Sequence, residues 1–97
     1  MLRIPGIPAP AQQHRVFLPG GRYVDLDAAY VEARVGVELD GARYHSSRED
    51  RERDMRRDTA LATLGWVSLR CSYRRLTGEP GACRREIEAV VRRRLDR

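Results

Sequence analysis

The sequence predicts a mixed α/β fold of the α+β kind, in which a four-stranded mixed sheet and two helices follow the order βββαβα. Three observations lead to this prediction. Alternating or apolar segments of strand length stand close together in the first 40 residues, separated only by short turns. A long charged helical segment comes next, and a further apolar strand separates it from a final amphipathic helix. We expect residues 13–97 to form one domain with a modest core, preceded by a Pro-rich extended segment at 1–12.

The first three strands are expected to form an antiparallel meander. Residues 13–18 and 22–30 alternate between polar and apolar side chains, and the Pro-Gly-Gly sequence at 19–21 is typical of a turn between them. Residues 34–40 form the third predicted strand. Because the connections are short, strands that follow one another in the chain should pair directly.

The charged helix is predicted to run from Ser46 to about Leu64. Ser46 is the expected N-cap with Glu49 as its capping-box partner, and Gly65 suits the position that follows the helix. The first half of the helix consists almost entirely of charged residues. We therefore expect this half to project over solvent or over a ligand, while the second half packs on the sheet.

The C-terminal part is predicted to add one strand at 66–71 and one helix at 80–95, joined by a loop with a single helical turn. A strand–helix–strand crossover should place the new strand parallel to the third one. Trp66 and Tyr30 adjoin turns at strand ends and are expected in the core, whereas His14 is expected at the surface.

The charge of the chain is its first indication of function. The net charge is +5, the chain has no lysine, and every basic residue is arginine. A guanidinium group binds phosphate oxygens in pairs, so this surface suits a nucleic acid, although GC-rich codon usage alone gives the same composition.

Several other classes of protein are not indicated. Cys71 and Cys83 lack the spacing of a zinc site, and we expect two buried thiols rather than a disulfide. The sequence has no apolar stretch long enough to span a membrane and no recognisable signal peptide. A cytoplasmic location is therefore expected.

Three acids are the candidate site. Asp27 lies in the predicted strand 22–30, eleven residues before Glu38, and Glu38 and Asp40 share one face of the next strand. Adjacent antiparallel strands can bring the three carboxylates to one end of the sheet, where they repel unless a cation is bound. Oxygen ligands beside a basic surface suit Mg²⁺ with phosphate in its shell. The alternative is ordinary turn chemistry, with Asp40 and Gly41 forming the turn.

Two segments carry a resemblance to a known family: "DAAYVEARVGVELDGARYH" and "RDMRRDTALATLGWVSLR". They closely resemble a bacterial endonuclease-like domain of unknown function, of the DUF559 type. That domain is related to the very-short-patch-repair mismatch endonucleases and belongs to the restriction-endonuclease-like PD-(D/E)xK superfamily. The resemblance covers about residues 13–95 and implies a restriction-endonuclease-like core.

The resemblance implies a metal-dependent nuclease and assigns roles to individual residues. Asp27 and Glu38 match metal-binding acids and, with the backbone carbonyl of Leu39, would hold Mg²⁺ or Mn²⁺. Asp40 stands where the wider superfamily has lysine, and either a catalytic role or turn formation is open to it. His45 resembles a histidine at the active site of the mismatch-repair relatives, where it could orient water or protonate the leaving oxygen.

The implied partner is DNA. Arginines of the charged helix, Arg51, Arg56 and Arg57, are expected to contact backbone phosphates without reading bases. Arg70 and Asp58 match further recurrent polar positions of the family, and Arg70 joins the predicted nucleic-acid contacts.

Two departures from the family pattern leave other functions open. The superfamily lysine is absent, because the chain contains none. Relatives also begin with a helix that packs on the sheet, and Met1 falls about where that helix should end. We therefore expect an upstream helix, a partner chain or a second copy to complete the fold. The alternatives to an endonuclease are a catalytically inactive module that binds nucleic acid or a regulatory protein, and a truncated remnant.

Overall fold

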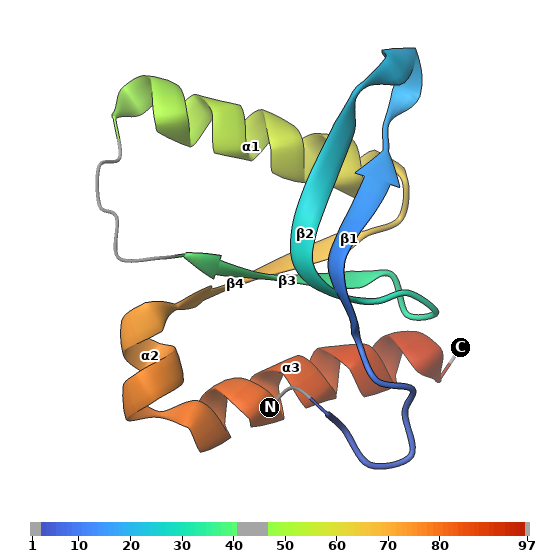
Figure 1. The fold of residues 1–97 in the computed structure, drawn as a ribbon, viewed down its shortest axis with the longest axis vertical. Coiled ribbons are helices and arrows are strands. Elements are labelled where there is room, and N and C mark those ends of the chain that lie inside the picture. Colours follow the sequence, from blue (N-terminus) through green and yellow to red (C-terminus); the bar gives the residue numbers. More distant parts are fainter. Residues whose placement is uncertain (1–2, 41–46, 97) are drawn as a thin grey trace.

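The computed structural model describes residues 3–40 and 47–96 and has the predicted mixed α/β architecture (Figure 1). Within these residues the elements are β1 (Ala11–Phe17), the short turn η1 (Pro19–Gly21), β2 (Tyr23–Tyr30), β3 (Val35–Asp40), α1 (Arg48–Thr63), β4 (Val67–Ser72), α2 (Tyr73–Gly78) and α3 (Pro80–Leu95).

The four strands form one sheet in the order β1-β2-β3-β4. The first three pair antiparallel, as the short turns predict, and β3 pairs parallel with β4 through the α1 crossover. Because α1 and α3 lie on opposite sides of β3 and β4 (Figure 1), each face of the sheet has its own helix.

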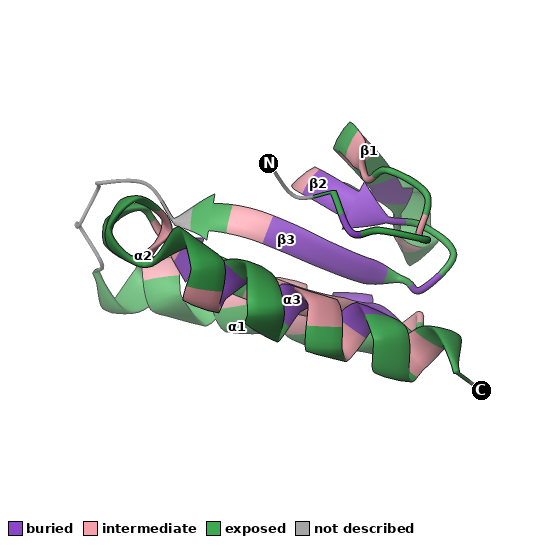
Figure 2. Ribbon diagram, turned by 90° about the horizontal axis from the view of Figure 1, so that it is seen from below, coloured by how far each residue is buried: buried purple, intermediate pink, exposed green. Residues whose placement is uncertain are grey.

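Each helix packs on its own apolar cluster. On the α3 side, Ile87 and Val91 pack on Tyr30, Val35 and Val37. On the α1 side, the cluster contains the following side chains: Val16, Val24, Leu26, Ala29, Leu61 and Trp66. Figure 2 shows that the first half of β3, residues 35–37, is buried. The sheet therefore has a buried apolar centre.

Two glycines lie at tight positions near α1. A side chain at Gly36 would place its Cβ 2.7 Å from Cδ1 of the buried Leu26, so a larger residue here would force the Leu26 side chain to move. Gly65 has a φ of +83° and follows the last residues of α1, where its N–H donates to the carbonyl of Ala62. The predicted role of Gly65 as the helix terminator is confirmed.

Several predicted details are confirmed and others need correction. Trp66 and Tyr30 are buried, as predicted. The N-cap of α1 is Ser47 rather than Ser46, because the Ser47 hydroxyl accepts from the Asp50 N–H at 3.0 Å. His14 is half-buried rather than on the surface, because it lies against the Trp66 ring at 5.7 Å between centroids.

The N-terminal segment contributes to the core. Ile4 is buried in the α3-side cluster, and β1 begins at Ala11, two residues before the predicted strand. The expected single helical turn after β4 is the six-residue helix α2. Cys71 and Cys83 are buried free thiols, as expected, and burial raises the pKa of Cys71. No helix among the described residues is long and apolar enough to cross a membrane.

Candidate functional site

The candidate site lies where β2 and β3 stop pairing. The last residue pair between them in this direction is Ala28 with Val37. One residue further along β2, the Oδ2 atom of Asp27 accepts from the backbone N–H of Leu39 at 2.8 Å. The Asp27 side chain thus replaces a ladder carbonyl, and β3 continues to Asp40 paired only with β4. A carboxylate is built into the fork between two strands.

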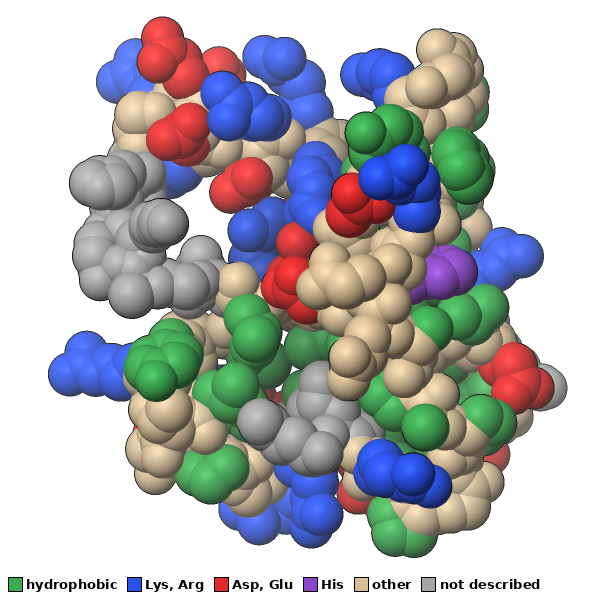
Figure 3. Space-filling model, viewed as in Figure 1, with side chains coloured by type: hydrophobic (Ala, Val, Ile, Leu, Met, Phe, Trp, Pro, Cys, Tyr) green, Lys and Arg blue, Asp and Glu red, His purple; other side chains and the backbone are tan. Residues whose placement is uncertain are grey.

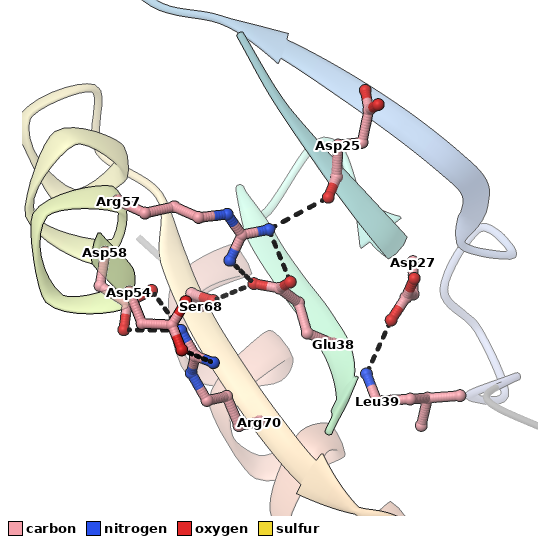
Figure 4. A network of polar contacts seen from close by, with 9 residues as sticks. All are labelled: Asp25, Asp27, Glu38, Leu39, Asp54, Arg57, Asp58, Ser68 and Arg70. Atoms are coloured by element: carbon pink, nitrogen blue, oxygen red, sulfur yellow. Dashed lines mark hydrogen bonds and ion pairs between the residues drawn. The ribbon is translucent and has the colours of Figure 1, made fainter. Parts of the chain in front are cut away.

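Glu38 is held by an arginine from α1 (Figure 4). Both carboxylate oxygens of Glu38 accept from the Arg57 guanidinium, with the Nη2 to Oε1 distance at 2.6 Å. The hydroxyl of Ser68 on β4 donates to Oε2 at 3.2 Å. The side chains of Glu38 and Arg57 are only 14% and 22% exposed, so this is a largely buried bidentate ion pair.

Arg57 also closes the fork from the α1 side. Its Nη2 atom donates to the backbone carbonyl of Asp25 on β2 at 3.1 Å. One guanidinium therefore connects α1, β2 and β3. The hydrogen bonds with Glu38 raise the pKa of Arg57 above the ordinary value of an arginine, while burial acts in the opposite direction. The arginine remains charged, and it neutralises Glu38 without any added cation.

A second ion-pair group lies beside the first. Arg70 on β4 donates to Asp54 at 3.4 Å and to both carboxylate oxygens of Asp58 at 3.2 and 3.3 Å. Both acids belong to α1. Figure 3 shows acidic and basic side chains mingled over this helix and in the hollow between it and the β1–β2 hairpin. The predicted nucleic-acid contact Arg70 is therefore engaged within the chain.

The structure places some of the other predicted site residues and does not describe the rest. Arg51 and Arg56 lie on the exposed side of α1, and Arg56 approaches Glu52 at 4.0 Å. Asp40 ends β3, but its side chain lies outside the described residues, and so does His45. Among residues 3–40 and 47–96, no group of three or more acidic, cysteine or histidine side chains is placed to hold a metal ion.

The two acids of the site face different surroundings. Asp27 lines a pocket of about 720 Å³ whose walls are apolar around Val37 and Leu39 and polar around Gln12 and Gln13. Glu38 belongs to the α1 side, against Arg57. The sequence pattern correctly brought Asp27 next to the Glu38–Leu39 segment. It did not reveal that the two carboxylates have different partners.

Sequence reasoning also missed the partner of Asp25. Arg15 lies opposite Asp25 on β1 and donates from Nε to Oδ1 at 2.8 Å and from Nη2 to Oδ2 at 3.2 Å. The hydrogen bond from Arg15 lowers the pKa of Asp25 below its ordinary value. The signal was present in the register, because opposite charges on directly paired residues attract.

The carboxylate oxygens of the site suit a hard divalent cation, but of the two described acids Asp27 and Glu38 only Asp27 has an oxygen that is not already hydrogen-bonded. The Oδ1 atom of Asp27 has no hydrogen-bond partner within the described part of the chain. Glu38, in contrast, has both oxygens bound by Arg57. Because Glu38 accepts hydrogen bonds from Arg57 and Ser68, a cation has to share this carboxylate with Arg57 or displace the guanidinium.

Comparison with known proteins supports a nuclease-type fold. Two curated relatives are similar to this chain: the uncharacterized protein MT2308 of Mycobacterium tuberculosis strain CDC 1551 / Oshkosh and the uncharacterized protein Rv2248 of strain ATCC 25618 / H37Rv. Each is 28% identical over 92 residues, which is 95% of this chain but 32% of the relative. The chain thus spans about a third of the length of these relatives.

No solved structure matches the chain. The family model REase_MTES_1575, which describes a restriction-endonuclease-like family, matches residues 12–91. That range contains β1 from its second residue, the other three strands, α1, α2 and most of α3. With the mixed sheet and the fork at Asp27 in place, the match shows that this chain belongs to the restriction-endonuclease-like family REase_MTES_1575.

Proposed function

We propose that this chain is a metal-dependent DNA endonuclease domain that hydrolyses phosphodiester bonds. Membership of a restriction-endonuclease-like family supports this proposal. The observation that carries it is the hydrogen bond that the Leu39 backbone N–H donates to Asp27, which fixes one acid next to Glu38 where β2 and β3 separate. A relation to the DUF559-type and very-short-patch-repair endonucleases, and a cytoplasmic location, belong to the same proposal.

In this proposal Asp27, Glu38 and the backbone carbonyl of Leu39 hold the divalent ion, Mg²⁺ or Mn²⁺. The bound ion would polarise the phosphate and lower the pKa of an attacking water. The remaining roles fall to side chains of this chain. His45 orients the water or protonates the leaving oxygen, and Asp40 supports the same site, in the place of the absent superfamily lysine.

Arg57 has two successive roles. Before substrate binds, its guanidinium neutralises Glu38 and joins α1 to the sheet. On substrate binding it transfers from the carboxylate to a phosphate oxygen, since both are bidentate partners of a guanidinium. Arg51 and Arg56 contact neighbouring phosphates from the exposed side of α1. Arg70 also contacts a phosphate, once its ion pairs with the two aspartates of α1 are broken.

A second function is favoured by the same ion pair. Both oxygens of Glu38 already accept hydrogen bonds, from Arg57 and Ser68, and the chain has no lysine. An inactive nuclease-fold module that binds nucleic acid or a regulatory protein would retain this network unchanged. The upstream helix, partner chain or second copy that we expect to complete the fold also remains a proposal, for either function.

Nicking of supercoiled plasmid in Mg²⁺ or Mn²⁺ tests the proposal. We expect cleavage by the wild type and background levels for Asp27→Asn and Glu38→Gln. Asp25→Asn is the matched control, because Asp25 lies two residues from Asp27 on β2 but faces Arg15. Equal nicking by all four proteins would reveal a contaminating nuclease. Folded wild type without cleavage, alone and in a version extended upstream, would favour the inactive module.

A further inference from the structure

The β1–β2 hairpin presents an aromatic pair to solvent. Phe17 and Tyr23 are directly opposite each other in the register, at the turn end of the hairpin. Their rings lie 6.4 Å apart in an edge-on arrangement, and 70% of Phe17 and 50% of Tyr23 are exposed. The guanidinium of Arg15 lies 3.8 Å from the centre of the Tyr23 ring. Two aromatic side chains and an arginine thus form one surface, which we call the aromatic tip.

The aromatic tip is not needed by the core. Strand side chains alternate, so Val16 and Val24 point to the other face of the hairpin. There they are buried with Leu26 in the α1-side cluster. The hairpin is therefore anchored on one face and could carry polar residues on the other without loss of packing. An exposed Phe–Tyr pair in this place is typical of a contact surface.

The position of the aromatic tip relates it to the candidate site. Tyr23, Asp25 and Asp27 are alternate residues of β2, and Arg15 stands opposite Asp25. At about 3.3 Å of rise per residue, Tyr23 lies about 13 Å along the strand from Asp27. That is about four base steps of 3.4 Å in a stacked strand. Figure 1 shows the hairpin extending beyond β3 and β4, clear of α3.

The chemistry of the aromatic tip selects a partner. Aromatic side chains bind nucleic acids by stacking on base faces, and these faces are covered in a continuous duplex. The guanidinium of Arg15 is paired with Asp25 and lies over one face of the Tyr23 ring, whereas Arg22 in the turn is exposed and has no ion pair within the described residues. An unpaired strand offers both a base face and a phosphate to these groups.

We propose that Phe17 and Tyr23 stack on unpaired bases a few nucleotides from a phosphate at Asp27, so that the chain prefers single-stranded or locally unpaired DNA to duplex. This inference deepens the proposed function and rests on it in taking DNA as the partner and Asp27 as the place where a phosphate is bound. The charged groups nearest to the aromatic tip are Arg15, Arg22 and Asp25.

Binding to labelled DNA tests the inference. Fluorescence anisotropy would compare a 20-nucleotide single strand with its duplex for wild type, Phe17→Ala, Tyr23→Ala and the double variant. Stacking on one base contributes enough that each single change should weaken single-strand binding about tenfold. Duplex binding should change less than about twofold. Tyr73→Ala is the matched control, because Tyr73 is 60% exposed on α2.

The possible outcomes are distinguishable. Single-strand binding that is unchanged in the double variant overturns the inference, as does tighter binding of duplex by the wild type. A sedimentation shift from dimer to monomer in the double variant would overturn it too, since the aromatic tip would then join two copies. Intact stacking without plasmid nicking supports the aromatic tip and rejects the nuclease. Plasmid nicking together with unchanged single-strand binding in the double variant supports the nuclease and rejects the aromatic tip.

Discussion

The two long helices, α1 and α3, have equal length but attach to the sheet by different means. Each has 16 residues. Helix α3 buries Cys83, Ile87 and Val91, whereas α1 buries only Leu61. The contacts of α1 with the strands are instead polar, through Arg57 to Glu38 and through two aspartates to Arg70. Helix α3 is held mainly by apolar packing, to which Arg94 adds a hydrogen bond to the carbonyl of Ala33, whereas α1 combines one buried apolar residue with ion pairs.

The same contrast appears in the charges. Helix α1 contains five arginines and five acidic residues, whereas α3 contains five arginines and two glutamates. From its sequence, α1 resembled a helix that offers its charges to a ligand. In the structure, its inward charges are used to attach the helix, and the excess positive charge belongs to α3. A charged helix beside a candidate site can thus be a structural element as well as a binding surface.

Removing Arg57 tests the attachment of α1 and should have the largest effect. Arg57→Met leaves the carboxylate of Glu38 without its partner in a site that is 14% exposed. Breaking such a pair costs about 3 kcal/mol of unfolding free energy. For a domain of this size the melting temperature should fall by about 10–20 °C. Urea unfolding followed by circular dichroism would measure the change.

The adjacent arginine is the control for this prediction. Arg56 lies on the same helix, its side chain is 80% exposed, and it approaches only Glu52, at 4.0 Å. Arg56→Met should change the unfolding free energy by less than about 0.5 kcal/mol. The double variant Glu38→Met with Arg57→Met should recover much of the loss, because no unpaired charge remains. Equal losses for Arg56→Met and Arg57→Met would contradict an ion-pair attachment.

The fold was predictable because its signals are local. The Pro-Gly-Gly turn, Gly65 and the apolar strands each act over a few residues, so the order of elements and the parallel β3–β4 pair followed from the sequence. The sequence also brought Asp27 next to Glu38, since a short antiparallel connection fixes the register.

The partners of charged side chains were not predictable in the same way. Arg57 and Arg56 are neighbours in the sequence, and only their angular positions on α1 decide which one meets Glu38. The one-residue error at Ser47 has a similar cause, because two adjacent serines offer equal capping chemistry. Where several identical charges compete, the packing of the helix decides, and packing is a property of the whole chain.

Removing two arginine charges from α1 or from α3 tests which of the two helices contributes more to DNA binding. The expected effect is smaller than that of Arg57→Met. Arg51→Gln with Arg56→Gln removes two proposed phosphate contacts from α1, and Arg85→Gln with Arg93→Gln removes two exposed charges from α3. We expect the α1 pair to weaken DNA binding about tenfold and to reduce the salt slope by about two. The α3 pair should stay within about threefold. The reverse order would assign DNA binding to the helix with excess positive charge.

The smallest expected effect concerns the polar contact that joins α3 to α2. Arg75 on α2 donates to both carboxylate oxygens of Glu86 on α3, at 3.0 Å each, and these hydrogen bonds lower the pKa of Glu86. A lowered pKa in the folded state contributes stability above the ordinary glutamate value of about 4.3. That stability is lost as the pH falls through the lowered pKa, so acid should weaken the contact between the helices.

Both Glu86→Gln and Arg75→Gln should therefore flatten the dependence of the urea midpoint on pH between about 5 and 2. The change should be slight, because the pair is exposed and water screens it. The two variants remove opposite halves of one interaction, so they should give equal flattening, and the double variant should add nothing further. Unequal or additive effects would mean that Glu86 has another partner, and that α3 depends on its charges more than its apolar packing indicates.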